Sequence, residues 1–130
     1  MAQVSYYLCI VIINKLSTMK RIYFDRMLVA GVQYGESLFC IDALKAGTKL
    51  NMVREPHNAH DPNAIALYYG EYRIGYIPAS ENSSLVPFLD QGWSEAFEAY
   101  IDSYCPDKHP SQQIGITIFI APRSAEPQKD

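Results

Sequence analysis

The chain has 130 residues, a length that fits one domain. Hydrophobic residues make up 48% of it and charged residues 19%, which excludes a disordered or collagen-like chain. Lys and Arg number 11 against 14 Asp and Glu, giving a net charge of −3. This balance excludes a strongly basic protein that coats nucleic acid by bulk phosphate neutralisation, but it leaves room for a small local binding site.

The cysteines indicate an intracellular chain. Cys9, Cys40 and Cys105 include no C-x-x-C pair, which argues against a zinc knuckle or a thioredoxin-type motif. Reduced thiols in a cytoplasmic protein are the simplest interpretation. The membrane-like stretch at residues 6–13 is too short to span a bilayer and has no signal-peptide flanks. We therefore expect a soluble cytoplasmic protein with no membrane partner.

The chain divides into three segments. Residues 1–18 form an N-terminal extension, which we interpret as an extra strand or as the product of a start site assigned upstream of Met19. Residues 19–122 carry the regular patterns of the domain. Residues 123–130 are polar and are expected to form a flexible tail.

Short apolar or alternating runs predict the strands. The predicted strands are residues 27–32, 50–54, 65–69, 72–77, 96–102 and 114–120. Gly70 and Glu71 separate the third run from the fourth, and glycine in the first position of a two-residue loop predicts an antiparallel type II′ hairpin. In the last run isoleucine recurs at every second position from Ile114 to Ile120, which predicts one buried face.

Helical signals are fewer. Residues 85–89 place apolar side chains at helical spacing, with Ser84 as the expected N-cap and Gly92 after the end. A second short helical turn is expected around residues 39–44. Five to six strands with one or two short helices predict a mainly β (α+β) fold, a small, partly open β-barrel of the OB type.

The most unusual segment is the polar connection between residues 54 and 65. His57 and His60 lie three residues apart beside Asp61, so a metal site and acid–base catalysis both have to be considered. No nearby Cys or His completes a metal-ligand set, and adjacent residues of an extended chain point in opposite directions. The sequence also lacks hydrolase and nucleotide-binding motifs. We expect no metal, no cofactor and no catalytic residue, with an Asx-turn at residues 61–63.

The aromatic composition points towards a binding surface. Tyr residues number 10, and five of them flank the predicted hairpin and the first loop: Tyr34, Tyr68, Tyr69, Tyr72 and Tyr76. Tyrosine offers a stacking face and a polar tip, which suits single-stranded nucleic acid. Arg54, Arg73 and Lys49 are the cations predicted to contact phosphate on the same side. Tyrosines at period two also fit a half-exposed sheet, so composition alone leaves both interpretations open.

Four segments together resemble a HIRAN domain. They are Val29-Ala30-Gly31-Val32-Gln33-Tyr34, Leu50-Asn51-Met52-Val53-Arg54-Glu55-Pro56, His60-Asp61-Pro62-Asn63-Ala64-Ile65 and Arg73-Ile74-Gly75-Tyr76-Ile77-Pro78. HIRAN domains precede the ATPase of fork-remodelling, helicase-like enzymes and also occur alone in bacteria and phages. The resemblance implies an OB-like barrel that captures the 3′ end of single-stranded DNA in DNA repair or replication.

The resemblance also implies roles for individual residues. Tyr34 matches a tyrosine that stacks on a base, and Asp61 matches an aspartate that accepts a hydrogen bond from the free 3′-hydroxyl. Gln33 stands where an arginine is expected, which removes a charge-assisted phosphate contact. His60 stands where a second tyrosine is expected, and its protonation would make binding pH-sensitive. The predicted DNA-binding set is Gln33, Tyr34, Arg54, His60, Asp61, Asn63, Arg73 and Tyr76.

The leading hypothesis is a non-enzymatic module that recognises the 3′-OH end of single-stranded DNA and works beside a separate helicase or nuclease. The alternative is a protein–protein interaction module on the same barrel. A hydrolase acting with a bound metal is the least favoured interpretation.

Overall fold

The computed structural model describes residues 20–122, so the extension at residues 1–18 and the tail at residues 123–130 lie outside the described residues. The described part contains the strands β1 (Ile22–Leu28), β2 (Lys49–Arg54), β3 (Ile65–Tyr69), β4 (Tyr72–Tyr76), β5 (Phe97–Tyr104) and β6 (Ile114–Ile120). It also contains the short α-helices α2 (Ala79–Asn82) and α3 (Val86–Asp90). The 3₁₀ turns are η1 (Val32–Tyr34), η2 (Ser37–Ala43), η3 (Ser94–Ala96) and η4 (Pro110–Gln112).

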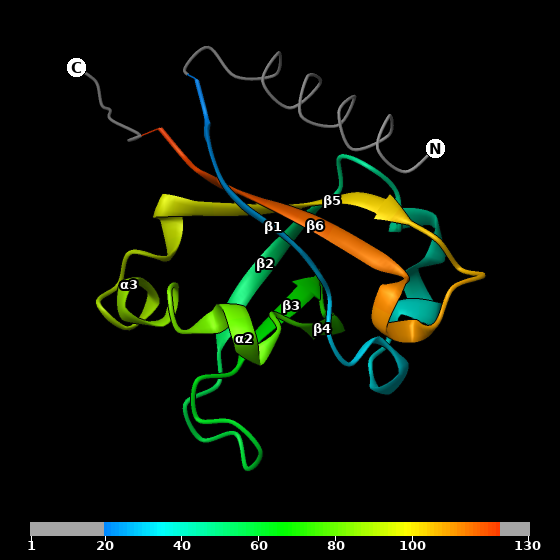
Figure 1. Cartoon of the computed structure of the whole chain (residues 1–130), viewed down its shortest axis with the longest axis horizontal. Coiled ribbons are helices and arrows are strands. Elements are labelled where there is room, and N and C mark those ends of the chain that lie inside the picture. Colours follow the sequence, from blue (N-terminus) through cyan, green and yellow to red (C-terminus); the bar gives the residue numbers. More distant parts are fainter. Residues whose placement is uncertain (1–19, 123–130) are drawn as a thin grey trace.

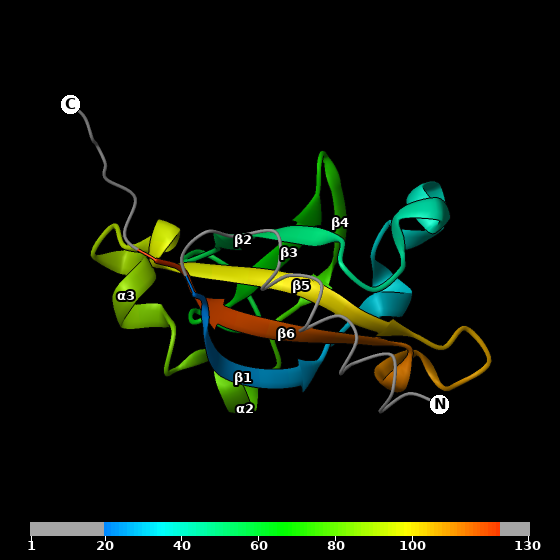
Figure 2. The same cartoon turned by 90° about the horizontal axis from the view of Figure 1, so that it is seen from above.

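The strands form one curved antiparallel sheet in the order β1-β6-β5-β2-β3-β4. Figure 2 shows β1, β6, β5 and β2 lying side by side in that order. The sheet bends until Ala30, just after β1, pairs with Tyr76 at the end of β4. Their backbones exchange two hydrogen bonds of 2.9 and 2.8 Å. Among the described residues, this bridge joins the two edges of the sheet at one point, so the barrel is not fully closed. The predicted mainly β, partly open barrel is therefore confirmed.

The predicted antiparallel hairpin of β3 and β4 is also confirmed. Tyr69 pairs with Tyr72 across the Gly70-Glu71 turn, where Gly70 has a φ of 59°. In β5 the alternate residues Phe97, Ala99 and Ile101 belong to the core, with exposures of 7%, 0% and 0%, while Tyr100 and Asp102 of the other face are also buried. The core face of β5 therefore follows the period of two, although its other face is covered too.

Strand β6 is buried on both faces, so the prediction of a single buried face was incomplete. Ile114, Ile116 and Ile118 join the core on one face. On the other face Phe119 packs edge-to-face against Tyr100, with ring centroids 6.0 Å apart. Thr117 follows the same face and donates a 2.7 Å hydrogen bond to the buried carboxylate of Asp102.

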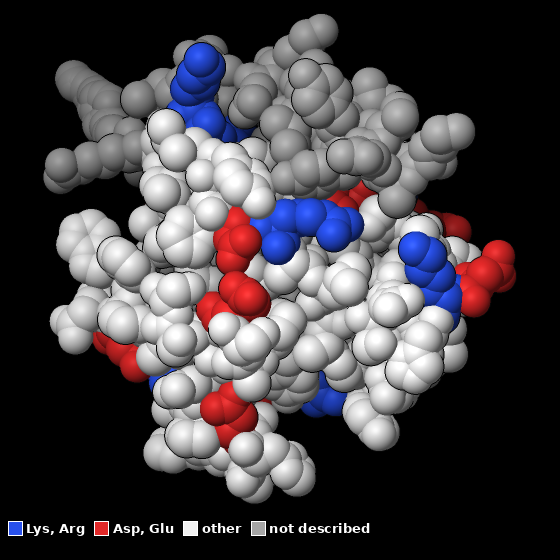
Figure 3. All heavy atoms as spheres, viewed as in Figure 1, with Lys and Arg blue, Asp and Glu red and all other residues white. Residues whose placement is uncertain are grey.

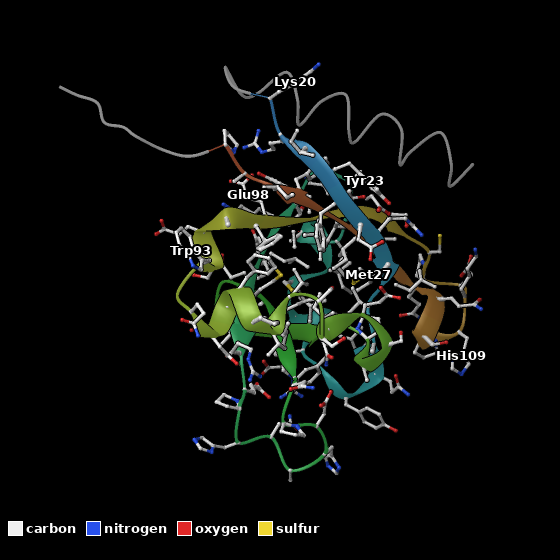
Figure 4. The ribbon with its side chains drawn as sticks, turned by 60° about the vertical axis from the view of Figure 1, so that its left-hand side comes forward. Lys20, Tyr23, Met27, Trp93, Glu98 and His109 are labelled. Atoms are coloured by element: carbon white, nitrogen blue, oxygen red, sulfur yellow. The ribbon has the colours of Figure 1, made fainter. Side chains whose placement is uncertain are left out.

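The first strand was predicted too late, because β1 runs from Ile22 to Leu28 and ends before Gly31. A register shift between Tyr23 and Asp25 interrupts the alternation of exposed and buried residues. Met27 of β1 is 7% exposed and belongs to the core, whereas Tyr23 of the same strand is 50% exposed (Figure 4). Gly31 has a φ of 69° and starts the 3₁₀ turn η1 instead of extending the strand.

The N-cap of the helix at residues 85–89 was predicted one residue too early, at Ser84 instead of Leu85. Ser84 does not cap α3, since its hydroxyl donates to the Glu81 carbonyl at the end of α2. The helix α2 itself was not predicted. Gly92 follows the end of α3 with a φ of 87°, as expected. The expected turn around residues 39–44 forms as the 3₁₀ segment η2.

Candidate nucleic-acid interface

A pocket of about 730 Å³ opens where η1, the β2–β3 loop and β4 meet. The β2–β3 loop projects below β3 in Figure 1 (green), and this projection forms one wall. The lining residues are Ala30, Gly31, Tyr34, Asn58, His60, Asp61, Ala64, Arg73, Tyr76, Ile77 and Ala79. Five of the eight predicted DNA-binding residues, Tyr34, His60, Asp61, Arg73 and Tyr76, are therefore brought together here, while Gln33, Arg54 and Asn63 lie outside the lining.

The pocket depends on the close approach of β1 to β4. A Cβ atom at Gly75 would lie 2.5 Å from Val29 Cγ1 and 2.6 Å from the carbonyl oxygen of Ala30. These separations are too short for any side chain, so only glycine lets the Ala30–Tyr76 bridge form beside the pocket.

The β2–β3 loop is held by side-chain to backbone hydrogen bonds. Asn58 Oδ1 accepts from the backbone N–H groups of His60 and Asp61 at 2.8 and 3.0 Å. Asp61 Oδ1 accepts from the backbone N–H of Asn63 at 2.9 Å, which is the predicted Asx-turn. Because Asn58 turns the chain here, His60 and Asp61 both belong to the pocket lining.

Asn82 fixes the second oxygen of the Asp61 carboxylate. This side chain is 2% exposed, and its Nδ2 donates to Asp61 Oδ2 at 2.9 Å. A carboxylate has about four lone-pair sites, so two remain for a ligand. Sequence reasoning missed Asn82, since nothing in the local sequence of α2 indicates that the helix packs beside this loop.

Tyr76 contributes a neutral phenol to the wall. Its hydroxyl donates to Glu55 Oε1 at 2.9 Å. Burial, followed by the hydrogen bond to Glu55, raises the pKa of Tyr76 above its usual value, so the group stays protonated at physiological pH. The Arg73 guanidinium lies over this ring, with 5.5 Å between Cζ and the ring centroid.

Among the described residues that line the pocket, Arg73 is the one Lys or Arg. Its Nη2 donates to the carbonyl oxygen of Tyr34 at 2.8 Å, while its buried Nε has no hydrogen-bond partner among residues 20–122. The other described arginines form ion pairs: Arg21 with Glu98, Arg26 with Asp102 and Arg54 with Asp90. No carboxylate of the described chain forms an ion pair with Arg73.

Arg54 lies behind the loop, with its side chain 14% exposed. Its Nη1 donates to the carbonyl oxygens of Pro62 and Ala64 at 3.0 Å each, and its Nε donates to Asp90 Oδ1 at 2.8 Å. The side chain therefore ties the loop to strand β2 and to helix α3. Lys49 points to another part of the sheet, where it pairs with Glu98 at 3.6 Å.

We expect Arg54→Ala to lower the free energy of unfolding by about 2 kcal/mol, because two backbone carbonyls lose a charged donor. The hydrogen bond that Asp90 accepts from Arg54 lowers the pKa of the Asp90 carboxyl group below its usual value. The part of the loss that comes from Asp90 is therefore present at neutral pH and disappears as Asp90 is protonated in acid. Urea unfolding at pH 7 and at pH 3 measures both effects. The exposed Lys45→Ala is the matched control, and an equal loss in both variants would contradict the assignment.

The histidines are dispersed. His57 is exposed and lies outside the pocket lining, and His109 lies between β5 and β6, where it contacts Ser111 (Figure 4). Within residues 20–122, no group of three or more His, Cys, Asp or Glu side chains is placed to hold a metal ion. None of the helices described is long and apolar enough to cross a membrane.

The charges on one face of the molecule are dispersed. On the face shown in Figure 3, Lys and Arg form small separate groups among Asp and Glu, with no continuous basic stripe. Such a surface offers little general attraction for a polyanion, so any phosphate contact has to come from particular side chains.

Comparison with curated proteins finds a partial relative. A Fanconi-associated nuclease 1 homolog from Oryza sativa subsp. japonica is 36% identical over 56 residues, which represent 40% of this chain and 6% of that protein. The chain thus spans a small fraction of the length of the relative that it matches.

Solved structures share the fold. A crystal structure of a protein from Lactobacillus plantarum has a TM-score of 0.59 at 22% identity, covering 77% of this chain and 94% of that one. The crystal structure of the HIRAN domain of human HLTF also has a TM-score of 0.59, at 15% identity, covering 77% of this chain and 78% of that one. A sequence model of the HIRAN domain matches residues 22–122. Because that match covers most of the chain, the protein belongs to the HIRAN domain family, a family of nucleic-acid-binding modules.

Proposed function

We propose that the pocket captures the free 3′-hydroxyl end of single-stranded DNA. The observation that carries this proposal is the combination of a fixed carboxylate, Asp61, and a guanidinium without an ion-pair partner, Arg73, in one aromatic-walled pocket. A nucleotide at a strand end presents a hydroxyl donor, a phosphate anion and a flat base. The pocket offers an acceptor, a cation and aromatic faces to match them.

Each group has a defined role in this proposal. Asp61 accepts a hydrogen bond from the 3′-hydroxyl through the lone pairs that Asn63 and Asn82 leave free. Tyr34, whose side chain is 76% exposed, and His60 stack on the terminal bases. Tyr76 completes the wall beneath Arg73.

The three predicted residues outside the lining act indirectly. Asn63 and Arg54 hold the β2–β3 loop, and with it Asp61, in position. Gln33 is exposed and precedes Tyr34 on η1, outside the pocket lining. We propose that none of them performs chemistry, and that a separate helicase or nuclease supplies any catalysis in DNA repair or replication. The nuclease homolog and the HLTF domain among the similar proteins support this context.

A topological comparison of ligands tests the proposal. Fluorescence anisotropy at low salt would compare a short linear single strand with a covalently closed circle of the same sequence and with a blunt duplex. The linear strand is expected to bind at least tenfold more tightly than the circle, because the circle has no end to enter the pocket. Equal affinity for the linear and circular strands would refute end capture while leaving general nucleic-acid binding in place.

An exposed apolar surface favours a second candidate function, contact with another protein. Leu38 and Phe39 of η2 are 76% and 72% exposed, and Phe39 stacks on Tyr72 with ring centroids 6.1 Å apart. They line a groove of about 580 Å³ that also includes Tyr69 and Lys45. Leu38→Ser with Phe39→Ser is expected to leave DNA affinity unchanged if this surface serves a separate partner. A loss of DNA affinity equal to that of a pocket variant would argue against this separation.

A further inference from the structure

The cation of the pocket comes from β4 and not from η1. Arg73 extends from β4 to the backbone of η1, where its Nη2 donates to the Tyr34 carbonyl at 2.8 Å. Gln33, the residue before Tyr34, is exposed and does not line the pocket. The Arg73 guanidinium is therefore the permanent positive charge that a ligand in this pocket meets, whereas Gln33 lies outside the lining.

The Arg73 guanidinium retains capacity for an anion. It has five N–H donors, of which one donates to Tyr34, while the buried Nε donates to no described residue. The described arginines 21, 26 and 54 are neutralised by a carboxylate, so an arginine held in a pocket without one is unusual in this chain. Because this Nε is covered by the protein, the donors left for an oxygen anion are those of Nη1 and the second donor of Nη2.

Two different elements of the pocket lining carry complementary groups. Asp61 is fixed on the β2–β3 loop and Arg73 on β4. In a terminal nucleotide the 3′-hydroxyl and the 5′-phosphate leave the sugar on different sides. A nucleotide whose hydroxyl faces Asp61 therefore directs the phosphate of the last linkage away from that carboxylate, and Arg73 is the cation of the pocket lining that this phosphate can meet.

We propose that Arg73 binds the phosphodiester that precedes the terminal nucleotide and supplies the cation that Gln33 lacks. This inference rests on the proposed capture of a 3′ end. The guanidinium is the suitable group, because it can keep its bond to Tyr34 and still present a planar pair of donors to phosphate oxygens. Lysine at position 73 would keep the charge and lose this geometry.

A neutral linkage tests the contact without altering the protein. A strand that carries a methylphosphonate at the last linkage is compared with the same strand carrying it several linkages further in. Wild-type protein is expected to bind the terminally modified strand about tenfold or more weakly, because a charged hydrogen bond is lost. Arg73→Gln is expected to bind the unmodified strand weakly too, and to show no further loss with the terminal methylphosphonate.

A double variant can transfer the positive charge from position 73 to position 33. Arg73→Gln combined with Gln33→Arg is expected to recover part of the lost affinity and to regain sensitivity to the terminal methylphosphonate. If wild type prefers a linear strand to a circle but is insensitive to the terminal methylphosphonate, the role of Arg73 is refuted and end capture stands. If wild type shows no preference for the linear strand, the proposed function fails first. If Arg73→Gln binds every strand more weakly but keeps the wild-type ratio of affinities for the terminally and internally modified strands, the side chain has a structural role only.

Discussion

Replacing Asp61 with asparagine is expected to abolish the preference of the protein for a 3′-hydroxyl over a 3′-phosphate. In the wild-type pocket a 3′-phosphate would face the carboxylate that Asn63 and Asn82 hold in place. Loss of the hydrogen bond together with charge repulsion corresponds to about 2–3 kcal/mol, or about 30- to 150-fold in affinity. Asparagine preserves the shape of the side chain and removes its charge, so the ratio of the two affinities should approach one.

The measurement is a pair of anisotropy titrations with strands that differ only in the 3′ group. Asp107→Asn is the matched control, because Asp107 is exposed on the β5–β6 connection and lies outside the pocket lining. The melting temperature of each variant checks that the domain stays folded when the Asp61 carboxylate, which accepts a hydrogen bond from Asn82, becomes an amide. A ratio that stays at the wild-type value in Asp61→Asn would remove Asp61 from end recognition.

The second large effect is expected from Gly75→Ala, which should lower the free energy of unfolding by about 3 kcal/mol. The added methyl group would lie 2.6 Å from the Ala30 carbonyl oxygen and 2.5 Å from Val29 Cγ1, so β1 and β4 would have to separate. Overpacking of this kind typically costs about 1–3 kcal/mol, and the two hydrogen bonds between Ala30 and Tyr76 weaken as well. The melting temperature should fall by about 10 °C, and DNA affinity should fall with it because the pocket is built on this bridge.

Gly70→Asn is the control for this prediction. Gly70 lies in the turn between β3 and β4 and has a φ of 59°, and a Cβ added there would meet no heavy atom of the described chain within 4 Å. Asparagine tolerates this backbone conformation, so the control should change stability by well under the effect at Gly75. Similar melting temperatures for the two variants would show that the close approach of β1 and β4 does not govern stability.

The hairpin and the core face of β5 could be predicted from the sequence, whereas the bounds of β1 could not. The hairpin of β3 and β4 follows from the Gly70-Glu71 turn, and the inward face of β5 follows from Phe97, Ala99 and Ile101. The bounds of β1 were missed because the register shift between Tyr23 and Asp25 breaks the alternation on which such predictions depend.

The candidate site divides in the same way. Residues that are adjacent in sequence, such as His60 and Asp61, could be grouped correctly, although their orientation depends on Asn58. Contacts between distant segments could not be foreseen. Asn82 contacts Asp61 from a helix that was not predicted. Arg54 and Arg73 carry the same charge, but Arg54 forms an ion pair with Asp90 whereas Arg73 donates to a backbone carbonyl. Only the folded chain distinguishes an arginine paired with Asp90 from one without an ion pair.

Nuclear magnetic resonance of the labelled chain, titrated with a short single strand that ends in a 3′-hydroxyl, would locate the bound strand end residue by residue. We expect shift changes at the backbone amides of Tyr34, His60, Asp61 and Asn63 and at the side-chain Nε–H of Arg73, with little change on η2. Changes confined to Leu38, Phe39 and the neighbouring groove, with the Arg73 Nε–H unmoved, would contradict end capture in this pocket and would place the binding surface elsewhere.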